Sequence, residues 1–119
     1  MTTRQLGKEG EERAARFLTQ HGYKILARNF LAVGGELDIV ARQRKTLVFV
    51  EVKARAYTAF GGPLAAVTSA KQKRILQAAM QYLKATGAKF DSIRFDVVCI
   101  LPEQIEHIQN AFTPGRTTL

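Results

Sequence analysis

The run from Leu47 to Lys53 constrains the fold of this chain most, because it is the strongest strand signal in the sequence. It is rich in Val and Phe, residue types that fit a pleated and buried surface. A second strand is predicted from Glu36 to Ala41, directly after the Gly34-Gly35 turn signal. Because a short turn centred on Arg44-Lys45 separates the two runs, we expect them to pair as an antiparallel hairpin.

Elements on either side of this hairpin complete an α/β pattern. Apolar residues at helical spacing, followed by Gly22, predict a first helix, and Thr68 or Ser69 is a suitable N-cap for a second. The remaining predicted segments are, in chain order, a helix over residues 5–21, a strand over 23–28, a loop over 55–63, a helix over 68–86 and strands over 92–101 and 105–109. We therefore predict an α/β fold, a mixed central sheet of roughly four to five strands flanked by helices. A single domain is expected over residues 1–112, followed by a flexible tail over residues 113–119.

The charge balance indicates a polyanionic partner. The chain has 119 residues, a formal net charge of +8 and a pI of about 10.1. Because clustered Lys and Arg release counterions from phosphates, nucleic acid or an anionic membrane surface is expected. A membrane-surface domain would need a long amphipathic helix with bulky apolar residues, which the sequence lacks, so nucleic acid is favoured.

The single cysteine and the N-terminal sequence further narrow the class of protein to which this chain can belong. Cys99 is the only cysteine, which excludes an intramolecular disulfide and a thiolate metal cluster. The first residues lack the apolar core of a signal peptide, and no apolar run is long enough to span a bilayer. A cytoplasmic location is therefore expected.

Charged side chains on the two hairpin strands form the pattern that indicates a metal-binding or catalytic site. Because side chains alternate along a strand, Glu36 and Asp38 share one face of theirs, and Glu51 and Lys53 share one face of the other. A turn centred on Arg44-Lys45 places Asp38 opposite Glu51 and Glu36 opposite Lys53. Side chains opposed in this way lie about 4.5–5.5 Å apart at Cβ.

Two facing carboxylates repel each other, and a divalent cation between them removes the repulsion. Mg²⁺ or Mn²⁺ suits the arrangement, with Asp38, Glu51 and the main-chain carbonyl of Val52 as oxygen ligands. Lys53 would then lie close enough to orient or help deprotonate a metal-bound water, or to stabilise negative charge on a phosphoryl group.

A plainer interpretation treats these residues as exposed charges on the solvent face of a hairpin. Glu36 and Lys53 would then form an ordinary cross-strand ion pair of little energetic value. Leu47 and Phe49 share the face of Glu51, however, so that face is not simply solvated. Acidic residues bordered by apolar ones favour a functional site.

Glu11 in the first predicted helix is a further candidate. Ala15 and Leu18 follow at helical spacing, which places Glu11 beside the apolar stripe, where a carboxylate needs a partner. The metal site on the sheet is one candidate partner, and a local cap or ion pair near the helix start is the alternative.

Basic residues near the candidate site could contact phosphates. Lys71, Lys73 and Arg74 in the second predicted helix, together with Arg55 after the last hairpin strand, are candidate nucleic-acid contacts. A solvated polar helix face explains the same pattern equally well.

An ordered series of motifs resembles the YraN-like family of bacterial proteins, which is placed among the PD-(D/E)xK nuclease-like folds. The motifs are Gly7-Lys8-Glu9-Gly10-Glu11, Ala27-Arg28-Asn29-Phe30, Gly35-Glu36-Leu37-Asp38, Val48-Phe49-Val50-Glu51-Val52-Lys53 and Arg94-Phe95-Asp96-Val97-Val98. The characterised proteins to which that family is similar are archaeal Holliday-junction resolvases. The resemblance implies a restriction-endonuclease-like core.

This resemblance also implies roles for single residues. Asp38 matches the first metal-binding acid of the fold, Glu51 the second, Lys53 the catalytic lysine and Glu11 an acidic residue on the first helix. Leu37 stands where the literal motif has Pro. The implied function is a Mg²⁺- or Mn²⁺-dependent endonuclease that acts on DNA, branched or recombination intermediates included.

Two further expectations accompany the resemblance. A non-catalytic nucleic-acid-binding or scaffold protein that retains the nuclease fold is the alternative function, since fold does not determine function. A homodimer is expected because related resolvases pair their active sites.

Overall fold

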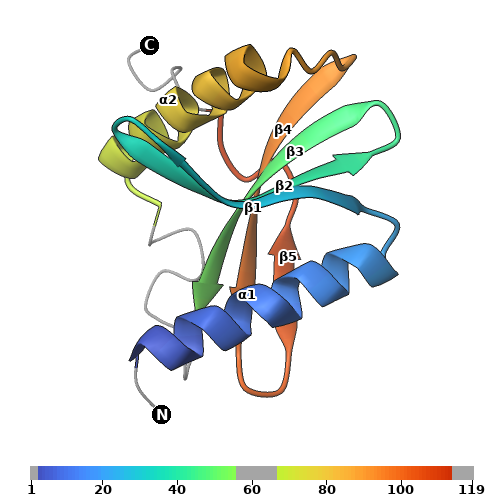
Figure 1. Ribbon diagram of the computed structural model, residues 1–119. Coiled ribbons are helices and arrows are strands. Elements are labelled where there is room, and N and C mark those ends of the chain that lie inside the picture. Colours follow the sequence, from blue (N-terminus) through green and yellow to red (C-terminus); the bar gives the residue numbers. More distant parts are fainter. Residues whose placement is uncertain (1–2, 56–66, 114–119) are drawn as a thin grey trace.

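A five-stranded mixed sheet with one helix on each face forms the framework of the protein in the computed structural model, which describes residues 3–55 and 67–113 (Figure 1). The elements are α1 (Thr3–Gln20), β1 (Lys24–Ala32), β2 (Gly35–Gln43), β3 (Thr46–Ala54), α2 (Ser69–Thr86), β4 (Ser92–Ile100) and β5 (Ile105–Ile108). The strand order is β1-β2-β3-β4-β5, with β3 and β4 parallel and all other neighbours antiparallel. The predicted fold class and element order are confirmed.

Both helices begin and end within about two residues of the predicted positions. Thr68 is the N-cap of α2, where its hydroxyl accepts a hydrogen bond from the Lys71 N–H at 3.2 Å. Gly87 ends α2 in the left-handed conformation, with φ of 65°. Gly22, with φ of 88°, follows α1 in the same way. Most of the predicted loop and the tail beyond residue 113 lie outside the described residues.

β1 is longer than predicted, since it ends at Ala32 rather than near residue 28. Asn29 has a positive φ of 53° and, like Arg28, is exposed, so the apolar alternation that marks a strand is broken there. Main-chain pairing with β2 nevertheless continues to Ala32 opposite Gly35. The main-chain hydrogen bonds of β1 depend on pairing with β2 and not on the pattern of its side chains. The strand therefore extends beyond the end that the side-chain pattern predicts.

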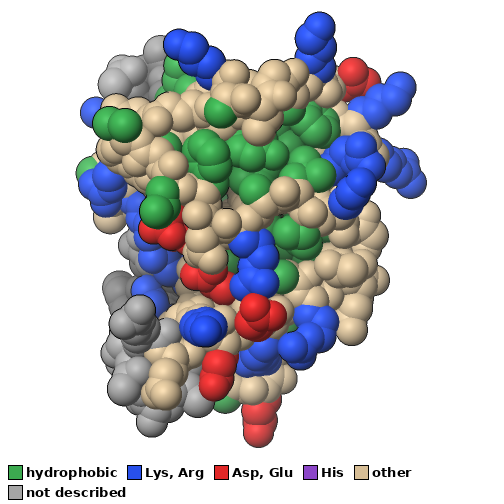
Figure 2. Space-filling model, in the orientation of Figure 1, with side chains coloured by type: hydrophobic (Ala, Val, Ile, Leu, Met, Phe, Trp, Pro, Cys, Tyr) green, Lys and Arg blue, Asp and Glu red, His purple; other side chains and the backbone are tan. Residues whose placement is uncertain are grey.

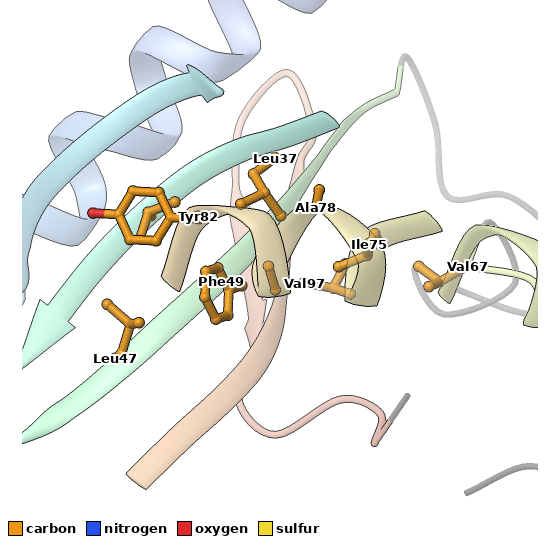
Figure 3. Packing of buried hydrophobic residues seen from close by; sticks show 10 residues of the cluster. Leu37, Leu47, Phe49, Val67, Ile75, Ala78, Tyr82 and Val97 are labelled. Carbon is orange, nitrogen blue, oxygen red and sulfur yellow. The ribbon is translucent and has the colours of Figure 1, made fainter. Parts of the chain in front are cut away.

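Two apolar layers hold the helices to the sheet. Figure 3 shows the layer under α2, where Ile75, Ala78 and Tyr82 of the helix pack over Leu37 and Phe49 of the sheet. The layer on the opposite face lies under α1 and is made by these buried residues: Ala14, Leu18, Tyr23, Ile39, Ala41, Val48, Val50, Val98 and Ile100. The sheet is therefore covered on both faces. None of the helices within residues 3–55 and 67–113 has the length and hydropathy to cross a membrane.

Two glycines allow the helices to approach the strands that carry the candidate site. A Cβ atom on Gly35, the first residue of β2, would overlap the main-chain carbonyl of Arg74 in α2. A Cβ atom on Gly10 in α1 would lie 2.7 Å from the Cβ of Ala54 at the end of β3. Both helices therefore contact the sheet through main chain at the end where the predicted acids lie.

The turn between β1 and β2 is attached to α2. The Gln81 side-chain amide accepts from the Val33 N–H at 2.9 Å and donates to the Val33 carbonyl at 2.7 Å. Val33 and Leu31 are 84% and 76% exposed, so this hairpin end presents two apolar side chains to solvent.

A buried carboxylate joins β4 to β5. Asp96 is fully buried and accepts hydrogen bonds from Arg94 at 2.9 Å, from His107 Nε2 at 2.8 Å and from the Asn110 N–H at 2.9 Å. Arg94 also donates to the Tyr23 hydroxyl at 2.6 Å, which extends the network to the start of β1. Burial would raise the pKa of Asp96, but these hydrogen bonds and the Arg94 charge hold the pKa below its ordinary value.

Gly35→Ala tests the close contact between β2 and α2. We expect a loss of roughly 2 kcal/mol or more in the free energy of unfolding, because the new methyl group overlaps main chain that cannot move aside. Gly7→Ala in α1 is the control, since its Cβ would meet nothing within 4 Å. It should leave stability unchanged or raise it by up to about 1 kcal/mol. Urea unfolding measures both, and equal stabilities would refute the contact.

Asp96→Asn tests the buried network. We expect a loss of roughly 3–5 kcal/mol, because Arg94 and His107 lose their charged partner in the interior. The lowered folded-state pKa means that wild-type Asp96 stabilises the fold above its unfolded pKa and loses that effect as pH falls below about 4. The stabilities of the two proteins should therefore converge in acid. The exposed Asp91→Asn is the control, and a gap that persists unchanged in acid would contradict the assignment.

Candidate metal centre

Asp38 lies where β2 and β3 part from each other. The ladder between these strands has the predicted register, but it ends at the pair Ile39–Val50. Beyond that pair, Asp38 Oδ2 accepts a hydrogen bond from the Val52 N–H at 2.9 Å. The Asp38 side chain thus replaces the next rung of the ladder, and Glu51 is not its main-chain partner.

The predicted pairing of Glu36 with Lys53 is not formed. Glu36 pairs instead with Leu31 of β1, because β2 follows its other neighbour in this region. The extrapolated register was wrong beyond Ile39 since the acid side chain intervenes between the two strands.

Asp38 and Glu51 nevertheless face one pocket of about 400 Å³. Its wall is formed by Leu31, Gly34, Gly35, Glu36, Asp38, Glu51, Lys71, Arg74 and Ile75. On the face drawn in Figure 2, charged side chains of both signs gather below an apolar area. The pocket lies between the β1–β2 hairpin, the end of β3 and the first half of α2, so three separate parts of the chain build it.

Glu51 is buried between two lysines. Its side chain is 8% exposed, and its Oε1 atom lies 2.7 Å from Lys71 Nζ and 3.5 Å from Lys53 Nζ. Lys53 therefore lies beside the second acid, as the pattern indicated. Lys71 was considered only as a phosphate contact, yet it belongs to the acid cluster. The spacing could have indicated this, because Lys71 lies four residues before the buried Ile75 and hence on the same helix face.

The pKa values of the pocket residues reflect charges of both signs that lie close together and are partly removed from water. Burial, and then the charge of Glu51, raise the pKa of Asp38 to about 7. Burial also lowers the pKa of Lys53, and the neighbouring Lys71 lowers it further. For Lys71 burial acts in the same direction, but hydrogen bonding to Glu51 and the charges of both acids outweigh it and raise the pKa.

Glu11 borders an adjoining hollow of about 750 Å³. Burial raises the pKa of Glu11, while a hydrogen bond from the Asn29 side chain and the charge of Arg28 oppose that rise. Its own charge contributes to the raised pKa of Asp38. The partners of Glu11 come from β1 rather than from the start of its own helix, and Glu11 is not among the residues that line the pocket of Asp38 and Glu51, so its role at a metal site stays a prediction.

The other predicted nucleic-acid contacts do not all lie at the pocket. Arg74 and Lys73 are both exposed, and of these two only Arg74 lines the pocket. Arg55 is half-buried, and its guanidinium donates to the Ala54 carbonyl at 3.1 Å. Only part of the predicted basic group therefore lies at the site.

A hard divalent cation fits the donor set of this pocket. Within residues 3–55 and 67–113, no three His, Cys, Asp or Glu side chains converge as a ready ligand group. Asp38 and Glu51 supply two carboxylates that repel each other, as the raised pKa of Asp38 reflects. Mg²⁺ needs few protein carboxylates because it keeps several waters. The Val52 carbonyl stays a predicted ligand, and its own N–H is bound to Asp38.

Asp38→Asn tests the charge repulsion in metal-free protein, since the amide still offers an oxygen to Val52. The folded-state pKa of about 7 exceeds the ordinary value of 3.8, so the folded state retains a proton that the unfolded state has lost. Wild-type stability should therefore fall by roughly 2–3 kcal/mol from this group between about pH 5 and about pH 8. In Asp38→Asn this fall should be absent.

Urea unfolding in EDTA at both pH values measures the effect. Asp91→Asn is the matched control, because it removes an exposed aspartate and should keep the wild-type pH dependence. The same pH dependence in Asp38→Asn and wild type would show that Asp38 is not the titrating group.

Comparison with solved structures finds an archaeal protein of related shape. A Holliday junction resolvase from the hyperthermophile Archaeoglobus fulgidus superposes with a TM-score of 0.48 at 17% sequence identity. The similarity covers 87% of this chain and 77% of that one.

Sequence comparison identifies the family. The description "Uncharacterised protein family UPF0102" matches residues 10–100, a range that includes Glu11, Asp38, Glu51, Lys53 and Lys71. A UPF0102 protein of Geobacter metallireducens is 50% identical over 92% of this chain and 93% of its own length. Another, of Syntrophomonas wolfei, is 51% identical over 92% of this chain and 98% of its own. The chain belongs to the UPF0102 family, the YraN-like family that its motifs resemble.

Proposed function

We propose that the protein is a divalent-metal-dependent nuclease that hydrolyses phosphodiester bonds in DNA. The observation that carries this proposal is the convergence of Asp38 and Glu51 on one pocket, with Lys53 against Glu51. The net charge of +8 supports a polyanionic substrate. The motif resemblance to archaeal resolvases makes branched DNA the first substrate to test.

The charged residues in and near the pocket have separate roles in this proposal. Asp38 and Glu51 would hold Mg²⁺ or Mn²⁺, and the negative charge of Glu11, which borders the adjoining hollow, would favour cation binding. Bound there, the metal supplies Lewis-acid stabilisation of phosphoryl charge and lowers the pKa of its water.

Lys53 acts on the attacking water or on the phosphate. Its lowered pKa allows its amine to accept a proton from that water, and its protonated form can donate to a phosphate oxygen. Arg74, which lines the same pocket, is placed to hold the phosphate backbone.

A binding or scaffold protein is the second candidate. Glu51 already has a cationic partner in Lys71 at 2.7 Å, and the described residues contain no ready group of three ligand side chains. A fold that binds DNA without cleaving it would retain this internally neutralised pocket. The homodimer also stays a prediction, which light scattering on the purified protein tests.

Cleavage assays distinguish the two functions. Purified protein is incubated with linear, supercoiled and four-way-junction DNA in Mg²⁺, Mn²⁺ or EDTA. We expect metal-dependent cleavage that Glu51→Gln abolishes and that Lys53→Met lowers about 100-fold or more. Glu103→Gln, an exposed acid on the loop between β4 and β5, is the matched control and should cleave as wild type does.

Two results would contradict the nuclease. Tight DNA binding without cleavage of any substrate under any metal condition favours the binding protein. Cleavage that survives Glu51→Gln at the wild-type rate would mean that the site is wrongly assigned or that a contaminant cleaves.

A further inference from the structure

Lys71 occupies an unusual place for a lysine in the first turn of a helix. Its N–H donates to the N-cap Thr68, so its backbone is held at the N-terminus of α2. The helix dipole disfavours a cation there, and α2 has no acidic residue in its first turn to offset the charge. The helix itself therefore gives no reason for a lysine at position 71, and the contacts of its side chain explain it instead.

The side chain of Lys71 reaches the buried acid of the pocket. Its Nζ lies 2.7 Å from Glu51 Oε1, compared with 3.5 Å for Lys53. The charge of Lys71 also acts on Asp38. One ammonium group thus counters both acids that we assign to the metal, and it takes up a carboxylate oxygen that a metal would need.

Both lysines are half-buried, and Lys71 is slightly the more exposed of the two. The side chain of Lys71 is 26% exposed and that of Lys53 17%. Lys71 belongs to the pocket wall, and its ammonium sits on a flexible four-carbon stem. It can leave Glu51 through side-chain rotation while α2 stays in place.

We propose that Lys71 is an exchangeable internal cation, which neutralises Glu51 in the metal-free protein and is displaced when a divalent metal binds there. This proposal rests on the metal site of the proposed function, but it does not require cleavage. An ammonium ion and a divalent cation repel each other at this distance and compete for the carboxylate oxygens of Glu51, so the Lys71 contact with Oε1 opposes binding of the metal there. Lys71 is accordingly a positioning residue that sets the metal affinity.

Removing the Lys71 charge should therefore tighten metal binding. We expect Lys71→Met and Lys71→Gln to bind Mn²⁺ roughly tenfold more tightly than wild type, because the competing cation is gone. Lys71→Arg keeps the charge and should stay near wild type. Lys84→Met, an exposed lysine in the last turn of α2, is the control and should also bind like wild type.

Isothermal titration with Mn²⁺, in the absence of DNA, measures these affinities. Circular dichroism confirms that each variant is folded, and Lys71→Gln serves if Lys71→Met is not. Metal-free Lys71→Met should also melt below wild type, and saturating Mn²⁺ should raise its melting temperature more than that of wild type. A purely structural lysine would lower the melting temperature without tightening Mn²⁺ binding.

The wild-type protein offers a second readout. Lys71 should react slowly with an amine-acetylating reagent while it is bound to Glu51, and faster once Mg²⁺ is added. Mass spectrometry of peptides quantifies this labelling, with Lys84 as the internal reference.

The outcomes separate this inference from the proposed function. Tighter Mn²⁺ binding by Lys71→Met without cleavage by any form supports the exchange and overturns the nuclease. Metal-dependent cleavage with Mn²⁺ affinity unchanged or weaker in Lys71→Met and Lys71→Gln overturns the exchange and leaves the nuclease. Lack of any Mn²⁺ binding by wild type and variants overturns both.

Discussion

The hydrogen bond from the Val52 N–H to Asp38 is the interaction on which the candidate site depends. Two antiparallel strands ordinarily continue their ladder, and a continued ladder would leave Asp38 and Glu51 as a repelling cross-strand pair. Here the ladder stops at Ile39–Val50, and a carboxylate takes up the next main-chain donor. The strands separate at this point, and a pocket lined by both acids lies there. The same contact therefore satisfies a partly buried N–H and keeps Asp38 oriented.

Other parts of the fold place cationic side chains at the point where β2 and β3 separate. The absence of a Cβ at Gly35 lets α2 lie against the start of β2, and this places Lys71 within reach of Glu51. The Thr68 cap sets where α2 begins, and hence which helix position faces the acid. Metal-free protein thus contains a neutralised carboxylate instead of a bare one, which limits the cost of burying like charges together.

Prediction from the sequence succeeded where the information is local. The hairpin turn at Arg44-Lys45 and the N-cap of α2 rest on neighbouring residues. Strand alternation also predicted that Asp38, Glu51 and Lys53 lie near one another, whereas their roles stay a prediction. The end of the ladder could not be predicted, because it depends on a side chain that competes with main-chain pairing.

Long-range placement limited the prediction in other parts of the chain. The role of Lys71 depends on how closely α2 packs, which a glycine on another element decides. His107 and Asp96 carry no common motif in the sequence, yet His107 donates to Asp96 because β5 returns beside β4.

The amide of Gln81 has a consequence for the rim of the pocket. Because it bonds to both the N–H and the carbonyl of Val33, this amide joins the hairpin end to α2. Leu31, which forms part of the pocket wall, lies on that hairpin end. The exposed Leu31 side chain therefore forms an apolar rim on this side of the pocket, and a contact outside the pocket holds that rim against α2.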